Sequence, residues 1–293
     1  MSGPDLSRRA LVAAALLASV GQGSAQTARA ADALRVATVD WAVLETLLAL
    51  GIAPVAATEL VLFRKVAVEP AVPPGVVDLG LRGSPNLEAL LLARPDLIFS
   101  SNFYAAMDPM LARIAPVDRQ SVYRQGISPY EPAEAITRAI GARTGRAEAA
   151  RMLVETTRAE IAQLRIGIAG ADGRAFLLIN LGDSRHFRVF GADSMFGAVA
   201  ERLGLANAWG ARTSYSASAP VGIETLARFP QAWIVIVPPV LPHSAFWRAL
   251  PSVTAGRVLT LDPINPFGAL PAAGRFARVL ARALQAGGAR GLG

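Results

Sequence analysis

Two stretches of this sequence decide the fold, because they read as one structural unit used twice. Residues 86–99 read NLEALLLARPDLIF, and residues 222–234, which start 136 positions later, read GIETLARFPQAWI. Each stretch places a glutamate in the first turn of a short helix, follows it with a proline that stops the helix, and then enters an apolar strand. A helix followed directly by a buried strand is typical of α/β proteins. The repeat therefore predicts two related α/β lobes.

A second pair of matching segments lies on the N-terminal side of these two stretches. Residues 47–52 (LLALGI) correspond to residues 200–205 (AERLGL), and both contain a glycine followed by an apolar residue, which is typical of a helix C-terminus. Short β-rich runs alternate with helical segments around both pairs. We expect strands at 34–39, 76–79, 97–100, 175–180, 187–190, 233–237 and 258–261, and helices at 43–50, 87–92, 107–114, 195–203 and 272–284.

A helix-rich stretch separates the two halves. Pro132 can occupy the first turn of a helix that ends near Gly145, and residues 147–165 continue as a second helix with apolar residues at helical spacing. At 1.5 Å per residue this helix is about 29 Å long, enough to cross from lobe to lobe as a stiff strut. The alternative is an ordinary lobe helix followed by a flexible loop at 167–173.

The predicted organisation is thus two Rossmann-like α/β lobes joined by a long connecting helix. The first lobe covers residues 31–145, the connecting helix residues 146–168, and the second lobe residues 169–293. Two facing lobes leave a cleft between them, and small-molecule sites form preferentially in such clefts. We therefore expect a ligand cleft between the lobes.

The first thirty residues are predicted to be an export signal. Arg8 and Arg9 precede an apolar run at residues 10–20, which is shorter than the roughly 20 residues that a membrane-crossing helix needs. Small residues then offer cleavage after Ala25 or after Ala30. The paired arginines favour the twin-arginine route, and a retained membrane anchor is the alternative. No later apolar run reaches membrane length, so we expect a mature protein without a membrane span, located in the periplasm.

Composition argues against several classes of function. The 293 residues contain no cysteine, and the two histidines, His186 and His243, are too far apart for a short metal-ligand motif, so no protein-held metal is expected. The net charge is +7, but the arginines that carry it are scattered, whereas nucleic-acid binding needs a basic patch or stripe. We expect no nucleic-acid partner.

The common enzymatic motifs are also missing. The chain has no G-x-S-x-G, P-loop or G-x-G-x-x-G motif. Residues 183–186 read DSRH, but neighbours in sequence do not make a catalytic triad. We therefore expect that the protein is not an enzyme. The alternative, from another functional class, is a secreted α/β hydrolase that uses Ser184.

Three side chains follow predicted strands of the first lobe, namely Trp41, Arg82 and Tyr104. Because neighbouring parallel strands end at the same edge of a sheet, we expect all three at one rim. Arginine and tyrosine donate hydrogen bonds to oxygen atoms, and tryptophan adds a broad apolar wall. The set fits a ligand with an oxygen-rich face and an apolar body. The alternative is a surface arginine paired to a carboxylate, with the aromatic residues in the core.

The sequence resembles the periplasmic ferric hydroxamate siderophore-binding proteins, which belong to a helical-backbone substrate-binding class that also serves cobalamin and haem importers. The resemblance covers nearly all of residues 34–284. It rests on residues 39–41 (VDW), 78–82 (DLGLR), 85–88 (PNLE), 189–191 (VFG) and 207–209 (NAW), together with Tyr104. It implies a monomeric protein that captures a ferric hydroxamate siderophore and delivers it to an inner-membrane ABC permease, with no catalytic step.

The resemblance also implies roles for single residues. Arg82 and Tyr104 match residues that hydrogen-bond the hydroxamate groups, and Trp41 matches an aromatic wall of the pocket. Siderophore oxygens already fill the coordination of the iron, so no cofactor is expected and no protein atom should ligate the metal. In the second lobe, Tyr215, Asn265 and Phe267 stand at or near pocket positions where the family usually carries tryptophan. Tyr215 and Phe267 could equally be core residues.

Two glutamates match the acidic residues with which this class docks onto arginines of its permease. Glu88 and Glu224 each open one copy of the internal repeat, and Asp108 is a further candidate. The alternative is that both glutamates only favour their helix N-termini. The cargo also has alternatives, which are cobalamin, haem or a catecholate siderophore. Catecholate complexes are strongly negative and would require several basic groups, whereas Arg82 alone is predicted in the cleft.

Overall fold

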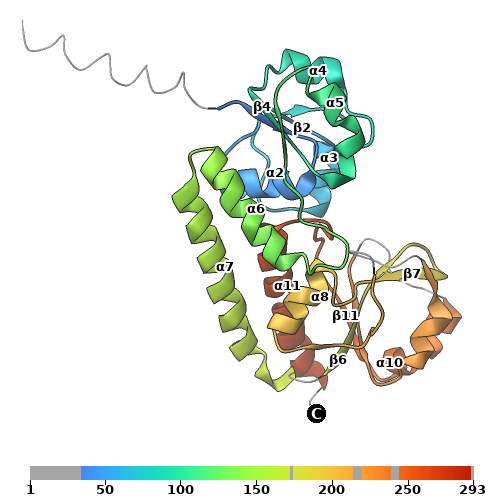
Figure 1. Cartoon of the computed structure of the whole chain (residues 1–293). Helices are drawn as coiled ribbons and strands as arrows, with labels where there is room; N and C mark the ends of the chain where they lie inside the picture. Colours follow the sequence, from blue (N-terminus) through green and yellow to red (C-terminus); the bar gives the residue numbers. More distant parts are fainter. Residues whose placement is uncertain (1–33, 172–173, 214–219, 239–243, 292–293) are drawn as a thin grey trace, which may run out of the picture. The chain divides into compact units, whose positions relative to one another are not determined.

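The computed structural model describes residues 34–171, 174–213, 220–238 and 244–291 (Figure 1). The predicted signal peptide at residues 1–30 lies outside these residues, as do Tyr215 and His243. Residues 35–293 form one structural unit. No helix among the described residues is long and apolar enough to span a membrane.

The first sheet is parallel throughout, in the order β3-β2-β1-β4-β5. Its central strands β1 and β4 are buried along their whole length, because helices cover both faces of a parallel sheet. The strands are β1 (Val36–Thr38), β2 (Ala56–Ala57), β3 (Val77–Asp78), β4 (Leu97–Ser100) and β5 (Val117–Arg119). The helices between them are α2 (Trp41–Ala49), α3 (Leu60–Val66), α4 (Leu87–Leu92), the 3₁₀ helix η1 (Asn102–Met107) and α5 (Asp108–Leu111).

The second sheet repeats this arrangement and adds an antiparallel part. Strands β8, β10 and β11 run parallel in the order β8-β6-β10-β11, whereas β7 pairs antiparallel with both β6 and β9. The strands are β6 (Ala175–Leu181), β7 (His186–Val189), β8 (Ala206–Asn207), β9 (Val221–Gly222), β10 (Trp233–Ile236) and β11 (Val258–Thr260). The helices are α8 (Met195–Arg202), η4 (Ile223–Arg228), α9 (Ala245–Ala249) and α10 (Pro251–Thr254).

The internal repeat is therefore confirmed as two related α/β lobes. The order β2-β1-β4-β5 in the first sheet matches β8-β6-β10-β11 in the second. The predicted helix ends also match, because Gly51 and Gly204 both take a left-handed backbone conformation, with φ of +74° and +83°. The residue after each glycine donates its N–H back into the last helical turn, at 2.9 Å in the first lobe and 3.0 Å in the second.

Two helices connect the lobes, α6 (Tyr130–Arg143) and α7 (Ala147–Gly167). The predicted strut is confirmed as one uninterrupted helix of 21 residues. The last helix, α11 (Leu270–Gly291), lies beside α7 (Figure 1) and also packs against α2 and α8. Although the sequence assigned α11 to the second lobe, the helix contacts both lobes.

The junction between the lobes is filled by a shared hydrophobic core. Leu47 of α2, Val154 of α7, Phe196 of α8 and Phe276 of α11 belong to one buried cluster. The rings of Phe196 and Phe276 stack with their centroids 4.4 Å apart. The two lobes are thus packed together along α7, α8 and α11.

Candidate functional site

A cavity of about 380 Å³ lies where the strands of the first sheet end. Every strand of that sheet is followed by a residue that lines it, because parallel strands bring their carboxyl ends to one edge. These residues are Asp40 and Trp41 after β1, Glu59 after β2, Arg82 after β3, Phe103 and Tyr104 after β4, and Tyr123 after β5. Phe267 is the described residue that the second half of the chain adds. Among the described residues, the cavity is therefore built mainly by the first lobe, with Phe267 added from the second half of the chain.

Trp41 forms the floor of this cavity. Asp40 caps α2, since its Oδ1 accepts the backbone N–H groups of Ala42 and Val43 at 2.7 and 3.1 Å. The indole of Trp41 then lies in the core, where its Nε1 donates to the carbonyl of Thr58 at 3.0 Å. Only 4% of the Trp41 surface is exposed. Trp41 was predicted as an aromatic wall of the pocket, and it does line the cavity, although Arg82 lies over its ring.

Arg82 is the residue that covers Trp41. Its guanidinium carbon lies 3.9 Å from the centroid of the Trp41 ring, which is cation–π distance. Its Nε donates to Oε2 of Glu59 at 2.6 Å, and its backbone N–H reaches Oε1 of the same carboxylate at 3.3 Å. Arg82 and Tyr104 line the same cavity, so the structure brings these two predicted residues together. Arg82 is also paired to a carboxylate, as in the alternative, but it is a partly buried cavity residue and not a surface arginine.

Glu59 is a cavity residue that the sequence reasoning missed. It follows β2, which has only two residues and therefore gives no readable strand pattern. Its backbone is left-handed, with φ of +50°, a conformation that is uncommon for residues other than glycine, and its N–H donates to the carbonyl of Gly80 at 2.8 Å. This turn aims the carboxylate at Arg82. The available signal was an acidic residue directly after a short run of small apolar residues.

Tyr104 is the third residue of the 3₁₀ helix η1, and it is half-buried. Burial, with the nearby Asp40 carboxyl as a weaker cause, raises the pKa of Tyr104 to about 12. The phenol therefore remains protonated at neutral pH and can donate a hydrogen bond. Burial also raises the pKa of Asp40.

Tyr123 was also missed, because the polar strand β5 before it carries no apolar pattern. Its hydroxyl donates to the carbonyl of Gly268 at 2.7 Å, and its ring packs edge-on against Phe267 with centroids 6.1 Å apart. The loop from residue 265 to residue 269 is thereby fastened to the first lobe. This contact places Phe267, which was predicted as a ligand residue, in the lining of the cavity.

Asn265 is not one of the described residues that line the cavity. It is buried, its Nδ2 donates to Oε1 of Glu45 at 2.7 Å, and its Oδ1 accepts the N–H of Phe267 at 3.1 Å. Glu45 also accepts the N–H of Ala269 at 3.1 Å. Burial raises the pKa of Glu45 to about 8. Asn265 was predicted to touch the ligand, but the structure places it behind Phe267, where it holds the loop.

Glu88 and Glu224 occupy equivalent and exposed positions. Each is the second residue of its helix, after the cap residues Asn86 in α4 and Gly222 in η4. The further candidate, Asp108, is tied internally, since it binds Arg119 and accepts the hydroxyl of Ser100 at 2.7 Å. The symmetric pair that the repeat predicted therefore consists of Glu88 and Glu224.

The segment that carries Ser184 forms a surface turn. Oδ1 of Asp183 accepts the backbone N–H groups of Arg185 and His186, both at 2.7 Å, and Oδ2 lies 3.0 Å from Nδ1 of His186. The aspartate thus shapes the turn between β6 and β7. Among the described residues there is no cluster of three or more histidines or carboxylates that could hold a metal ion.

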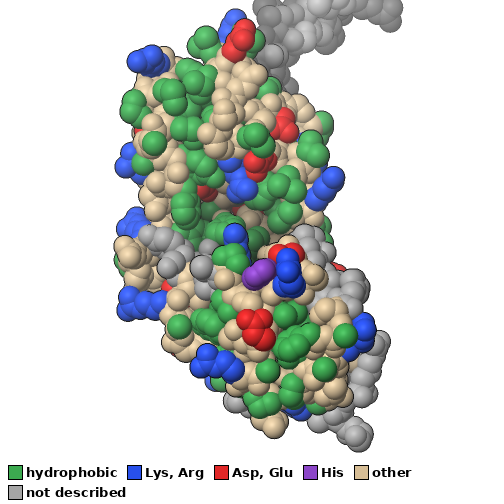
Figure 2. All heavy atoms as spheres, turned by 90° about the vertical axis from the view of Figure 1, so that its right-hand side faces the viewer, with side chains coloured by type: hydrophobic (Ala, Val, Ile, Leu, Met, Phe, Trp, Pro, Cys, Tyr) green, Lys and Arg blue, Asp and Glu red, His purple; other side chains and the backbone are tan. Residues whose placement is uncertain are grey.

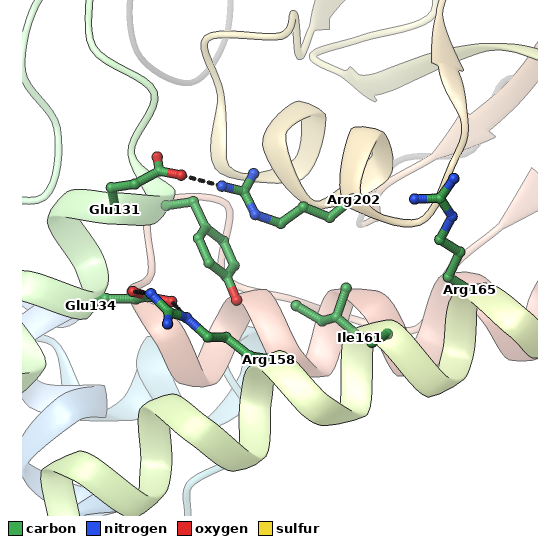
Figure 3. Close-up of a pocket in the computed structure, with 8 residues that line it drawn as sticks. Glu131, Glu134, Arg158, Ile161, Arg165 and Arg202 are labelled. Atoms are coloured by element: carbon green, nitrogen blue, oxygen red, sulfur yellow. Dashed lines mark hydrogen bonds and ion pairs between the residues drawn. The ribbon is translucent and has the colours of Figure 1, made fainter.

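A second cavity, of about 450 Å³, lies between α6, α7 and α8 and contains none of the predicted ligand residues (Figure 3). Arg158 of α7 pairs with Glu134 of α6, and Arg202 of α8 pairs with Glu131. The guanidinium of Arg202 also lies 3.9 Å from the ring centroid of Tyr130. These pairs join three helices at the lobe junction, so their main effect is structural.

Comparison with known proteins gives a family and close relatives. A sequence profile described as periplasmic binding protein matches residues 36–264. The iron(3+)-hydroxamate-binding protein FhuD of Escherichia coli (strain K12) is 32% identical, over 97% of this chain and 99% of the relative. The structure of the siderophore-binding protein FhuD of Vibrio cholerae, bound to Fe³⁺–Desferal, matches with a TM-score of 0.82 at 26% identity, covering 87% of this chain and 99% of that chain.

More distant structures share the fold alone. FhuD2 of Staphylococcus aureus with bound ferrioxamine B has a TM-score of 0.69 at 17% identity, over 86% of this chain and 98% of that one. The periplasmic catecholate-siderophore binding protein VctP of Vibrio cholerae has a TM-score of 0.65 at 16% identity, over 86% and 93%. Since these two proteins take different ligands, the fold by itself does not decide the ligand.

Proposed function

The chain belongs to the periplasmic binding protein family, and we propose that it captures a ferric hydroxamate siderophore in the periplasm and delivers it to an inner-membrane ABC importer. The observation that carries the proposal is one cavity lined by the hydrogen-bond donors Arg82 and Tyr104 together with the aromatic residues Phe103, Tyr123 and Phe267. The relative from E. coli, which binds iron(3+)-hydroxamate, supports the same ligand class.

The proposed recognition uses the outer surface of the chelate. Hydroxamate oxygens that coordinate iron retain lone pairs, and the terminal N–H groups of Arg82 and the hydroxyl of Tyr104 can donate to them. Aromatic side chains then cover the apolar spacers of the siderophore. Iron is cargo in this account, held by siderophore oxygens and by no protein side chain.

We assign to Glu88 and Glu224 the role of docking the chain onto the permease. Both carboxylates are exposed at the same place in the two repeats, so they can meet two basic sites on a partner with twofold pseudosymmetry. Charge pairs at such a rim guide the encounter more than they add affinity. The chain carries out no catalytic step, and export by the twin-arginine route is proposed from Arg8 and Arg9.

Tryptophan fluorescence tests the proposed ligand directly, since Trp41 lies under Arg82 in the cavity. The purified mature chain is titrated with a ferric trihydroxamate, a ferric tricatecholate, haem and cobalamin. Saturable quenching by the trihydroxamate alone, or at much lower concentration than by the others, supports the proposal. Quenching by one of the other three ligands, with none by the trihydroxamate, refutes it.

A further inference from the structure

We propose that Glu59 makes the cavity select ferric chelates by charge, admitting cationic and neutral complexes and disfavouring anionic ones. The inference rests on the proposed function, because it concerns the ligand class of the same site. It begins from the ion pair between Glu59 and Arg82, whose Nε and Oε2 lie 2.6 Å apart.

The described residues that line the cavity carry no net positive charge. Its described charged residues are the two acidic residues Asp40 and Glu59 and the single cation Arg82. The two stretches outside the described residues, 214–219 (SYSASA) and 239–243 (PVLPH), contain no lysine or arginine. Because Glu59 cancels the charge of Arg82, the described part of the site is neutral or negative. An anionic chelate entering it would lose hydration without gaining a net attraction.

The pairing is fixed by the backbone, so the two charges are held together. Glu59 takes its left-handed conformation with its N–H bonded to Gly80, and its two carboxylate oxygens engage the side chain and the backbone of Arg82. The side chains are only 16% exposed for Glu59 and 28% for Arg82. Partly buried charges are screened much less than surface charges, so the negative charge of Glu59 acts on whatever occupies the cavity.

Arg82 keeps its hydrogen-bonding ability in this arrangement. Glu59 occupies Nε, Trp41 lies under one face of the guanidinium, and Tyr104 is within hydrogen-bonding reach of it. The two terminal nitrogens carry four N–H groups, so donors remain for a ligand. A guanidinium held in this way can donate to a neutral, oxygen-rich surface without attracting net negative charge. With Glu59 beside it, Arg82 can donate hydrogen bonds to a ligand without adding net positive charge to the cavity. This arrangement suits the uncharged iron centre of a trihydroxamate complex.

The test compares three ferric complexes that share one chelating core and differ in charge. A linear trihydroxamate with a terminal ammonium gives a cationic complex, its N-acetyl derivative a neutral one, and its N-succinyl derivative an anionic one. Dissociation constants for all three are measured with the wild-type chain, with Glu59→Gln, and with Glu88→Gln as a matched control, because Glu88 is exposed on α4 outside the cavity.

We expect the wild-type chain to bind the cationic complex more tightly than the anionic one. Glu59→Gln should weaken binding of the cationic complex and strengthen binding of the anionic one by about tenfold each, the effect of one unit charge roughly 10 Å away at an effective dielectric constant of about 25. The ratio of the two affinities should therefore shift towards the anionic complex by about a hundredfold. Glu88→Gln should leave the ratio unchanged. A change in all three affinities by one common factor would mean that Glu59 only supports the fold, and would overturn the proposal.

Two further outcomes separate this inference from the proposed function. If wild-type protein binds all three complexes equally, charge selection is refuted while siderophore binding stands. If it binds none of them, both proposals fail. Should Glu59→Gln not fold, the salt dependence of the wild-type chain decides. Added salt must weaken binding of the cationic complex and strengthen binding of the anionic one, and equal responses would refute charge selection.

Discussion

The two lobes share a scaffold but differ in what they place at their strand ends. In the first lobe, every strand of the sheet is followed by a cavity residue, from Asp40 after β1 to Tyr123 after β5. In the second lobe, β6 turns into the antiparallel hairpin with β7, and the described residues contribute only Phe267 to the cavity. The two halves thus share the sheet and the helix ends, whereas the described residues that line the cavity come mainly from the first half.

The one described contribution of the second half is itself held by the first lobe. Tyr123 and Glu45 bind the loop that carries Phe267, through Gly268, Asn265 and Ala269. Phe267 should therefore stay with the first lobe if the lobes move.

The largest expected effect is at Arg82. Arg82→Ala should weaken binding of a ferric trihydroxamate by about 1.5 to 3 kcal/mol, the scale of a charge-assisted hydrogen bond, without unfolding the chain. Arg188→Ala, an exposed arginine on β7 of the second lobe, is the matched control. Fluorescence titration measures both. Unchanged affinity in Arg82→Ala would remove this residue from the site.

A second prediction concerns the symmetric glutamates, where the two lobes are expected to act alike. Glu88→Ala combined with Glu224→Ala should leave ligand binding intact and lower uptake through the permease by about tenfold, since pairs of opposite charge guide association. Each single variant should show a smaller loss. Uptake of radioactive iron bound to the siderophore measures the effect, and normal uptake by the double variant would refute the docking role.

A third prediction tests the asymmetry between the lobes. Phe267→Ala should weaken ligand binding by about 1 to 2 kcal/mol, because part of an aromatic wall is lost. Phe246→Ala, an exposed phenylalanine on α9 of the second lobe, should change nothing. Calorimetric titration of both variants is decisive: if they bind equally well, Phe267 is only a core residue.

The last prediction concerns stability rather than ligand binding, through the pH dependence that Glu45 contributes. Burial raises its pKa from 4.5 to about 8, so the folded chain binds more protons than the unfolded chain between these values. Its contribution to the free energy of unfolding is present at low pH and falls as pH rises through this window, by at most about 1.4 kcal/mol per pH unit.

Chemical denaturation of the wild-type chain and of Glu45→Gln across this pH window isolates that contribution. The difference in unfolding free energy between the two proteins should change with pH, in favour of the variant as pH rises. Glu88→Gln, with an exposed carboxylate, should show the wild-type dependence. A constant difference between the wild-type chain and Glu45→Gln would show that Glu45 does not titrate as the structure implies.

Sequence reasoning succeeds where a signal is local. The helix at 87–92 and the strand at 97–100 were predicted to the residue, because capping, a proline stop and an apolar run all lie within one short stretch. Arg82, Tyr104 and Phe267 were predicted as site residues and do line the cavity. Tyr104 follows the apolar run at 97–100, and Arg82 follows the short apolar run at 76–79, whereas the resemblance to a family supplied Phe267.

Sequence reasoning fails where position depends on distant contacts. Glu59 follows a two-residue strand, and Tyr123 follows a polar one, so neither strand has a readable pattern. Asn265 was expected at the ligand, but its partner Glu45 lies 220 positions away in the chain, and no local pattern reveals that pairing. The shared core that closes the lobe junction is likewise made by residues from both halves.

The central claim is that the first lobe grips a prewrapped iron chelate by its periphery, and one calorimetric comparison tests it most directly. Chromium(III) exchanges its ligands far more slowly than iron(III), so a protein side chain cannot readily displace a hydroxamate oxygen from it. The account predicts equal affinity for the chromium(III) and iron(III) complexes of one trihydroxamate. Tight binding of the iron complex with little binding of the chromium complex would show that the protein ligates the metal, and would contradict the account.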